Sequence, residues 1–397
     1  MSHWQTVALG DVCTLLNGRA YKKNELLSEG KYPVLRVGNF FSNRKWYYSD
    51  LELEENKYCD NGDLLYAWSA SFGPRIWEGE KVIYHYHIWK TKLDDKRINK
   101  RFLYYWFDWD TNQIKSDHGA GSTMIHVTKS SMEKRKLRLP PLPEQKRIVA
   151  ILDKAFEGID TAIANTEKNL ANARELFESV LNQMFNQTGE GWVEHSMSDI
   201  CKITSKLVDP REGEYIDLPH VGAGNMESGT GGLVEVKTAR EEKLISGKFV
   251  FDESMVLYSK IRPYLMKVCK PDFVGLCSAD VYPLSPIPEK LDRSYLFYLL
   301  LSKHFTDYAI SGSERAGMPK VNRTHLFKYT LNLPCLEKQR EYAKKIELMS
   351  NEVQMLERLY TDKRKSLIEL KQSILNKAFS GELTTIKDDE LRTEEVA

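Results

Sequence analysis

The chain contains one long segment twice, and this duplication constrains its fold more than any other feature. Residues 139–185 return as residues 333–379, a shift of 194 positions without a gap, and ten of the 47 paired residues are identical. Gln145 and Gln339 are one of these identical pairs. A repeat of this length must be accommodated twice in a single architecture. We therefore expect a fold built from two equivalent halves.

Both copies have the pattern of a long helix that pairs with another helix. Proline occurs only in the first five positions of each copy, where a helix tolerates it. Apolar residues then recur at alternating steps of four and three, the period of a coiled coil. The predicted seam is Ile148, Leu152, Ala155, Ile159, Ala162, Thr166, Asn169, Ala173, Leu176 and Val180 in the first copy, and Tyr342, Ile346, Met349, Val353, Leu356, Tyr360, Lys363, Leu367, Leu370 and Ile374 in the second.

Each helix should contain about 40 residues and measure about 60 Å. Neither seam can be buried alone, so we expect the two helices to form an antiparallel coiled coil. The polar seam positions near the two centres would then meet and help to fix the register. These positions are Thr166, Asn169, Tyr360 and Lys363. The alternative is two long surface helices that pack separately, each on its own domain.

The duplication extends into the segments before the helices, where short apolar runs bounded by Gly, Asn and Pro are typical of strands. Matching Val37-Gly38 with Val221-Gly222 leaves Asn225 two places further along than Asn39. The expected strands lie at residues 32–39, 62–69 and 82–89, and at 216–222, 254–260 and, in part, 273–284. Short buried helices are expected at residues 102–109 and 296–301. The fold class is α+β, with two duplicated globular domains joined by the helices.

These patterns divide the chain into five parts. A first globular domain covers residues 1–138, a central helical region 139–190, a second domain 191–332, and a C-terminal helical region 333–380. The remaining residues, 381–397, form an acidic tail that we expect to be mobile.

Composition and motifs exclude several classes of protein. Hydrophobic residues make up 42% of the chain and charged residues 28%, which is typical of globular domains, and the net charge is +1. We find neither a signal peptide nor an apolar run near 18 residues. The six cysteines have no zinc spacing, which favours reduced thiols in a cytoplasmic protein. They are Cys13, Cys59, Cys201, Cys269, Cys277 and Cys335.

Catalytic and cofactor motifs are missing as well. We find no phosphate-binding GxxxxGK[ST] loop, no Gly-rich cofactor loop between a strand and a helix, and no adenine-methyltransferase signature. His85 and His87 would share one face of a strand at residues 82–89, but no third ligand accompanies them, so we expect no metal. Two domains without catalytic residues on a helical spacer favour recognition at two places.

This organisation closely resembles the specificity subunit of Type I restriction–modification enzymes, the HsdS family. The resemblance rests on two divergent domains, on the segment LPPLPEQKRIVAILD at residues 139–153, and on the long helix after each domain. The second copy departs from the motif at Cys335, Glu337 and Lys338. The resemblance implies that this chain is not an enzyme but the DNA-recognition subunit, with each domain a target-recognition domain that reads half of a bipartite asymmetric sequence.

The resemblance also implies partners and cofactors. Two methyltransferase subunits and restriction subunits would assemble on this chain. The chain would bind double-stranded DNA, would not bind a membrane, and would act in phage defence. S-adenosylmethionine, ATP and magnesium would belong to those partner subunits, and this chain would bind none of them.

Candidate DNA-binding residues are basic and polar side chains in or beside loops, where they can reach base edges or phosphates. Gly-rich loops at residues 118–124 and 312–318 add weight, since both domains carry one at the same phase of the repeat. Trp46 and Trp68 are flanking aromatics. The candidates are Arg36, Asn39, Arg44, Lys45, Arg75, Ser122, Thr123 and Lys129 in the first domain, and His220, Asn225, Lys260, Arg262, Lys320 and Arg323 in the second.

Candidate partner-binding residues are apolar side chains on the helix faces away from the seam. They would be exposed on an isolated chain, and such patches mark interaction sites. The candidates are Phe156, Phe177, Leu348 and Leu359.

Two other functions remain open at this point. A self-contained DNA methyltransferase or nuclease would transfer methyl groups or cut DNA without a partner. A coiled-coil scaffold, or an orphan DNA-binding protein, would have no restriction partners. Salt-dependent, sequence-selective binding of DNA separates a recognition subunit from a scaffold.

Overall fold

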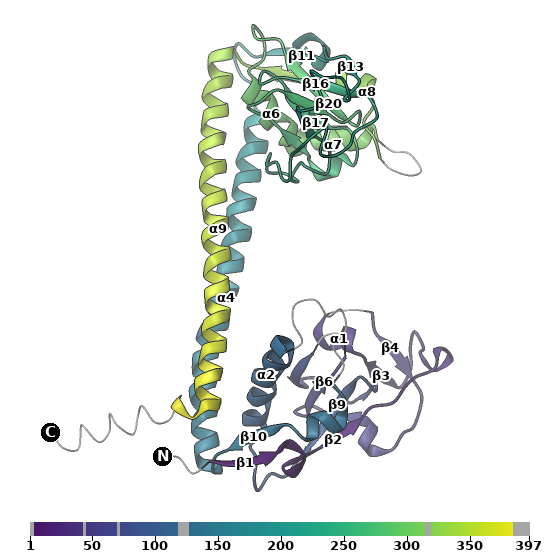
Figure 1. Cartoon of the computed structure of the whole chain (residues 1–397), viewed down its shortest axis with the longest axis vertical. Helices are drawn as coiled ribbons and strands as arrows, with labels where there is room; N and C mark the ends of the chain where they lie inside the picture. The colour runs from purple at the N-terminus through teal and green to yellow at the C-terminus, as the bar shows by residue number, and fades with distance from the viewer. Residues whose placement is uncertain (1–3, 43–44, 70–71, 118–126, 314–318, 384–397) are drawn as a thin grey trace, which may run out of the picture. The chain divides into compact units, whose positions relative to one another are not determined.

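The computed structural model describes residues 4–42, 45–69, 72–117, 127–313 and 319–383. The chain divides into two compact units, Met1–Thr166 with Asp362–Ala397, and Glu167–Thr361. Each unit contains one globular domain and segments of both long helices, so each is described by itself (Figure 1).

In its described residues, the first domain consists of short strands and three α-helices. Its strands are β1 (Gln5–Ala8), β2 (Cys13–Asn17), β3 (Tyr32–Leu35), β4 (Tyr47–Ser49), β5 (Tyr58–Cys59), β6 (Leu64–Ala67), β7 (Gly73–Ile76), β8 (Val82–Tyr84), β9 (Ile88–Leu93) and β10 (Lys136–Leu139). Its helices are α1 (Val37–Phe41), α2 (Lys100–Asp117) and α3 (Lys129–Glu133), with 3-10 turns η1 (Leu9–Asp11), η2 (Lys23–Glu25) and η3 (Glu55–Lys57).

These strands form two four-stranded sheets and a ribbon. One sheet has the antiparallel order β2-β9-β6-β7, and the other has the order β4-β3-β8-β5, in which β3 and β8 are parallel. The ribbon pairs β1 with β10, so the chain enters and leaves the domain side by side. Helix α2 contributes Phe102, Trp106 and Phe107 to a core that also contains Tyr66 and Trp89 of the first sheet.

The second domain repeats this plan. Its strands are β11 (Val193–Ser196), β12 (Cys201–Lys202), β13 (Leu207–Val208), β14 (Pro219–Val221), β15 (Lys237–Thr238), β16 (Lys248–Phe251), β17 (Val256–Ser259), β18 (Val268–Cys269), β19 (Gly275–Cys277), β20 (Val281–Pro286) and β21 (Thr330–Leu333). Its helices are α5 (Met197–Ile200), α6 (Arg293–Leu301), α7 (Lys303–Ser311) and α8 (Arg323–Phe327), with the 3-10 turn η4 (Pro263–Leu265).

Sheet order shows the equivalence of the two domains. The order β12-β20-β17-β18 matches β2-β9-β6-β7, and the β11–β21 ribbon matches β1–β10. The other sheet has the order β13-β16-β19-β14-β15, in which β14 and β19 are parallel, as β3 and β8 are in the first domain. The expected α+β class and the duplicated domains are confirmed.

Strand register corrects one detail of the sequence comparison. Leu35 pairs with Tyr84 in the first domain, and Val221 pairs with Cys277 in the second. Leu35 is therefore equivalent to Val221, and Asn39 lies at the same position as Asn225, not two places before it. Matching the two Val-Gly pairs was wrong by two residues, because the strand register and not the dipeptide fixes the alignment.

The sequence predicts a single strand at residues 82–89, but the structure has two. Strand β8 ends at Tyr84 and β9 begins at Ile88, and residues 85–87 turn the chain from one sheet into the other. The alternation of side chains across this run resembles a strand because both flanking segments are strands. The expected helix at residues 102–109 also extends further, as α2 covers Lys100–Asp117.

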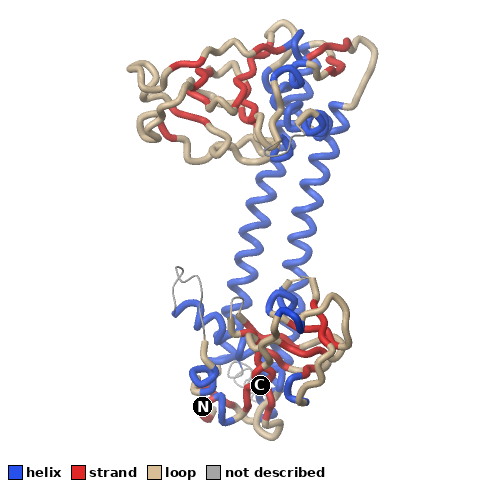
Figure 2. Tube along the Cα trace, turned by 90° about the vertical axis from the view of Figure 1, so that its right-hand side faces the viewer, coloured by secondary structure: helices blue, strands red, loops and turns tan. Residues whose placement is uncertain are grey.

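The two long helices are α4 (Leu142–Phe185) and α9 (Leu336–Ser380). They run antiparallel within each unit, as expected. In the first unit the Lys371 Nζ donates to Asp160 Oδ1 at 2.9 Å. In the second unit the Arg174 Nε donates to Glu357 Oε1 at 2.6 Å. Figure 2 shows both helices in blue.

The predicted seam is buried or half-buried at most of its positions in α4, and Asn169 and Leu176 are its exposed exceptions. Ile148 and Leu152 are fully buried, but Leu176 is 61% exposed while Leu181 is only 4% exposed. In α9, Leu370 is likewise 48% exposed and Leu375 is buried. These helix ends pack against a domain as well as against each other. Thr166 is buried, and its hydroxyl donates to Ala162 O of its own helix at 2.7 Å.

A buried glutamine attaches the start of each long helix to its domain. The Gln145 Nε2 donates to Arg97 O and Pro140 O at 2.9 and 2.8 Å, and Gln145 Oε1 accepts from Asn99 N at 2.8 Å. Gln339 repeats all three bonds at 2.9 Å, with Lys290 O, Pro334 O and Asp292 N as partners. The identity of this residue in the two copies therefore has a structural cause.

Candidate DNA-contacting surface

Four basic candidates of the second domain lie close together. Lys260 follows β17, and its backbone carbonyl accepts from Val321 N at 2.8 Å. The Arg262 backbone N–H donates to Pro319 O at 2.9 Å, so the segments that carry Lys320 and Arg323 run alongside. Arg262 and Arg323 are exposed, and no side-chain hydrogen bond or ion pair is found for either among the described residues. The cluster thus combines two segments far apart in sequence.

Asp280 organises two of these cations, and sequence reasoning missed it. Lys260 Nζ and Lys320 Nζ each lie 3.3 Å from Asp280 Oδ1. Burial raises the pKa of this carboxyl, but the hydrogen bonds from both lysines outweigh it, so the pKa is lowered. The carboxylate holds the ammonium groups in place and neutralises part of their charge. Only strand register places Asp280 beside Lys260, so a single sequence carries no signal for it.

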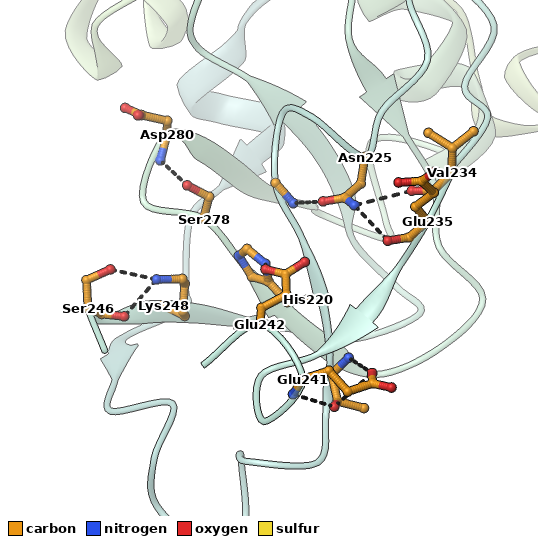
Figure 3. A network of polar contacts seen from close by, with 12 residues as sticks. His220, Asn225, Val234, Glu235, Glu241, Glu242, Ser246, Lys248, Ser278 and Asp280 are labelled. Atoms are coloured by element: carbon orange, nitrogen blue, oxygen red, sulfur yellow. Dashed lines mark hydrogen bonds and ion pairs between the residues drawn. The ribbon is translucent and has the colours of Figure 1, made fainter. Parts of the chain in front are cut away.

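His220 is not available for base reading, which contradicts our expectation. It occupies β14 at the position of Val34, and it is only 6% exposed. Its Nδ1 lies 2.8 Å from Glu242 Oε2 (Figure 3). Burial lowers the pKa of His220 although Glu242 opposes this, so the ring is neutral and its Nδ1–H donates to the carboxylate. Its Nε2 has no hydrogen-bond partner among the described residues.

Asn39 and Asn225 shape loops rather than presenting free amides. Asn225 Oδ1 accepts from Gly222 N at 2.9 Å, and its Nδ2 donates to the carbonyls of Val234 and Glu235 at 3.2 and 3.1 Å (Figure 3). The equivalent Asn39 Nδ2 donates to Lys45 O at 3.4 Å. Both amides therefore hold the segment that follows the parallel strand.

The first-domain candidates gather around α1. Arg75 lies on β7, and its guanidinium donates to Phe40 O of that helix. Lys45 is exposed just after α1, and Arg36 precedes the helix with its guanidinium 5.3 Å from the Tyr47 ring centroid. Three basic side chains from β7 and the flanks of α1 therefore share one region of the domain.

Lys129 and Arg323 occupy equivalent helix starts. Each is the first residue of a short helix whose N-cap side chain, Thr128 or Asn322, accepts a backbone hydrogen bond. Lys129 lies 3.5 Å from Glu133, whereas Arg323 is exposed. Arg44, Ser122 and Thr123 lie outside the described residues, together with most of the two Gly-rich loops.

The partner-binding candidates fall into three environments. Phe156 is 4% exposed and packs against Tyr105 at a ring distance of 5.4 Å, so our expectation of an exposed residue was wrong. Its side chain points into the first domain because α4 packs on α2 there. Leu348 and Leu359 are 57% and 58% exposed, as expected.

Phe177 is half-buried and lines a cavity of about 590 Å³ within the second unit. The walls come from α4, α9, α6, α7 and the loops at residues 228–230 and 266. Leu181, Met266 and Val353 supply apolar surface, and both partners of the Arg174–Glu357 ion pair also line the cavity. This cavity opens an apolar surface beside the helix pair.

The described part of the chain shows neither a metal site nor a membrane-spanning helix. Within the described ranges, no group of three or more His, Cys, Asp or Glu residues could hold a metal ion. No helix in the same part of the chain is long and apolar enough to cross a membrane. All six cysteines are free thiols, and Cys335 alone among them is exposed.

The chain has two equivalent domains on paired helices, and the second domain carries a basic cluster. The family model of the Type I restriction modification DNA specificity domain matches residues 1–172 and 189–361, so the chain belongs to this family. Its members are DNA-recognition components that act with methylase and restriction subunits and are not catalytic. This chain is accordingly a non-catalytic specificity subunit, as the resemblance implied.

Individual relatives agree along almost the whole chain. The Type I restriction enzyme EcoDI specificity subunit of Escherichia coli is 26% identical, with 96% of this chain and 89% of that protein covered. The MjaVIII specificity subunit of Methanocaldococcus jannaschii is 22% identical, with 96% and 93% covered.

Solved structures show the same fold. A chain from a study of complex assembly and conformational transition of the type I R-M system has a TM-score of 0.73 at 20% identity, covering 96% of this chain and 98% of that one. The HsdS subunit from Thermoanaerobacter tengcongensis has a TM-score of 0.53 at 19% identity, with 96% and 97% covered.

Proposed function

We propose that each domain reads one half of a bipartite, asymmetric DNA sequence, and that the basic side chains around Asp280 contact the half-site of the second domain. The observation that carries this proposal is the clustering of four basic residues in the second domain, whose fold repeats that of the first. These residues are Lys260, Arg262, Lys320 and Arg323. Basic side chains provide phosphate contacts and bidentate contacts to guanine. The chain itself binds no cofactor, and it acts in the cytoplasm.

Domain exchange tests this proposal. Residues 5–138 are replaced by the equivalent domain of a relative, and the methylated motif is read by methylome sequencing in cells that supply the methyltransferase subunits. We expect a change in one half of the motif only. The reciprocal exchange of residues 193–332 is the matched control and should alter the other half. A change of both halves by either exchange contradicts independent reading.

Single substitutions separate the roles of the basic residues. A base-reading arginine replaced by alanine should cost about 1–3 kcal/mol and relax one position of the motif. A phosphate-contacting lysine replaced by alanine should weaken binding to all sequences alike and reduce the salt slope by about one. Arg262→Ala and Lys320→Ala apply this test to neighbouring residues of one cluster.

We further propose that two methyltransferase subunits dock on the helix pair, and that restriction subunits join the assembly. S-adenosylmethionine, ATP and magnesium are held by these partners. The cavity at Phe177, with Leu181 and Val353 beside it, supports an apolar docking surface in the second unit. Leu348 and Leu359 add exposed apolar area on α9.

Co-purification tests the docking surface. Phe177→Asp places a charge in the apolar cavity and should release a methyltransferase subunit while both domains remain folded. Ile245→Asp is the control, because Ile245 is 78% exposed on the second domain and away from the cavity lining. Thermal unfolding verifies that the variants are folded. Full retention of the partner by folded Phe177→Asp contradicts this placement.

A further inference from the structure

The two domains carry chemically different side chains on the same backbone turn. Residues 85–87 join β8 to β9, and residues 278–280 join β19 to β20. The first amide of each turn donates to the last residue of the parallel strand, at 2.9 Å to Leu35 O and 3.1 Å to Val221 O. The turns are therefore equivalent, and their residues can be compared one by one.

A neighbouring side chain supports this equivalence. Trp68 follows β6 and Lys260 follows β17, and each donates its backbone N–H to the last residue of its turn, at 3.1 and 3.0 Å. Trp68 Nε1 also donates to Tyr86 O at 2.8 Å, and Lys260 Nζ donates to Ala279 O at 2.7 Å. An indole in the first domain and an ammonium group in the second therefore donate to equivalent carbonyls of equivalent turns.

The chemistry that each turn presents is different. In the second domain, Asp280 holds Lys260 and Lys320, so the turn is ionic. In the first domain, the Tyr86 ring lies 6.1 Å from Trp68 and 4.0 Å from His87, measured between centroids. Tyr86 is 38% exposed, and Phe41 is the other exposed large apolar side chain among the described residues of this domain.

The aromatic turn is also uncharged at one of its histidines. Burial, and then the neighbouring His87 and Arg36, lower the pKa of His85 to about 4. This aromatic surface next to the Arg36 guanidinium offers apolar contact beside a cation. Apolar contact with the C5-methyl group of thymine is one of the ways in which proteins read the major groove.

We propose that Tyr86, supported by Trp68 and His87, determines specificity in the first domain by packing against a thymine methyl group of its half-site. The second domain uses ionic contacts at the equivalent turn. This inference rests on the proposed function, since it requires that the first domain reads a half-site. Such a contact releases no counterions, so its contribution to affinity is independent of salt.

Replacement of thymine by deoxyuridine, which lacks the methyl group, tests this contact directly. The chain is assembled with its methyltransferase subunits and bound to duplexes carrying the methylated motif, with one thymine replaced at a time. We expect about fourfold weaker binding at one position of the first half-site, which is the value of one buried methyl group. The Tyr86→Ala variant should bind the unmodified duplex at least as weakly as the wild type binds the deoxyuridine duplex. Deoxyuridine at that position should not weaken the binding of the variant further.

Two controls define the comparison. Lys320→Ala should reduce the salt slope by about one, whereas Tyr86→Ala should leave it unchanged. Ile245→Ala removes an exposed apolar side chain elsewhere and should change neither quantity. If Tyr86→Ala does not fold, Tyr86→Gln, which keeps a side chain of similar reach without a ring, takes its place in every measurement.

Several results would overturn the inference. The first is wild-type affinity of the folded Tyr86 variant. The second is a deoxyuridine effect on binding that is as large in that variant as in the wild type. The third is a first half-site without thymine. A wild-type complex that shows no sequence selectivity contradicts the proposed function instead. A selective wild type with an indifferent Tyr86 variant contradicts this inference alone.

Discussion

Gln145 and Gln339 each join three backbone groups where a long helix meets its domain. Each amide accepts one hydrogen bond and donates two, so it uses both of its ends. A residue that could only donate or only accept would leave at least one of these groups unsatisfied. The LPxLxxQ start of each helix therefore encodes the attachment of a domain.

Gln339→Leu should destabilise the second domain by about 3 kcal/mol, because it leaves three backbone groups without this partner. Hydrogen exchange resolved by domain measures the effect, which should be absent from the first domain. Gln145→Leu should produce the converse pattern. Gln183→Leu, at an exposed position of α4, is the matched control and should have little effect. Equal loss of protection in both domains would argue against two separate attachments.

His85 makes the stability of the first domain depend on pH. Its pKa is lowered from 6.5 to about 4 by burial and by His87 and Arg36, so the unfolded chain binds a proton that the folded chain does not. The first domain should therefore lose stability as the pH falls from 6.5 towards 4. His85→Phe should flatten this part of the profile. Domain-resolved hydrogen exchange across this pH range provides the measurement, and an unchanged slope in the variant would contradict the assignment.

At the scale of elements, the repeat and the helices could be predicted because their signals are local and long. Nearly fifty matched positions and a persistent apolar period identify α4 and α9 without knowledge of tertiary contacts. The turn at residues 85–87 could not be predicted, because alternating apolar side chains do not reveal where one strand ends and another begins. Asp280 was missed for the same reason, since its proximity to Lys260 depends on strand pairing.

The seam of the long helices was predicted incompletely, because a strict 3.5-residue period assumes that only the other helix is packed against. Near its C-terminal end α4 also packs on the second domain, and Phe177 and Leu181 face that core. Leu176 points elsewhere and is exposed. Where a helix packs on both another helix and a domain, its buried positions depend on both neighbours. Sequence periodicity alone does not predict these positions.

The corrected register makes a matched pair of substitutions informative. Leu181→Ala should cost about 3 kcal/mol, because it opens a space in a packed core. Leu176→Ala should change stability by less than about 0.5 kcal/mol, since this side chain is already exposed. The free energy of unfolding in denaturant measures both. The reverse ranking would restore the seam that the sequence pattern predicted.

At the scale of the whole molecule, we expect the paired helices to set the gap between the two half-sites. Inserting seven residues into both helices, near Thr166 and Tyr360, preserves the heptad and adds about 10 Å. Duplex DNA advances about 3.4 Å per base pair, so the gap should grow by about three base pairs. Methylome sequencing of the variant is the measurement. Unaltered half-sites with a longer gap support this role, and an unchanged gap in an active variant refutes it.

The β1–β10 and β11–β21 ribbons have a consequence for how such a gene can change. Because each domain begins and ends on two adjacent strands, the coding segment between them is a cassette with both junctions in one ribbon. Two crossovers there replace a whole domain and leave the helices and their partners untouched. New target sequences can therefore arise in one recombination event, without passing through intermediates that recognise nothing.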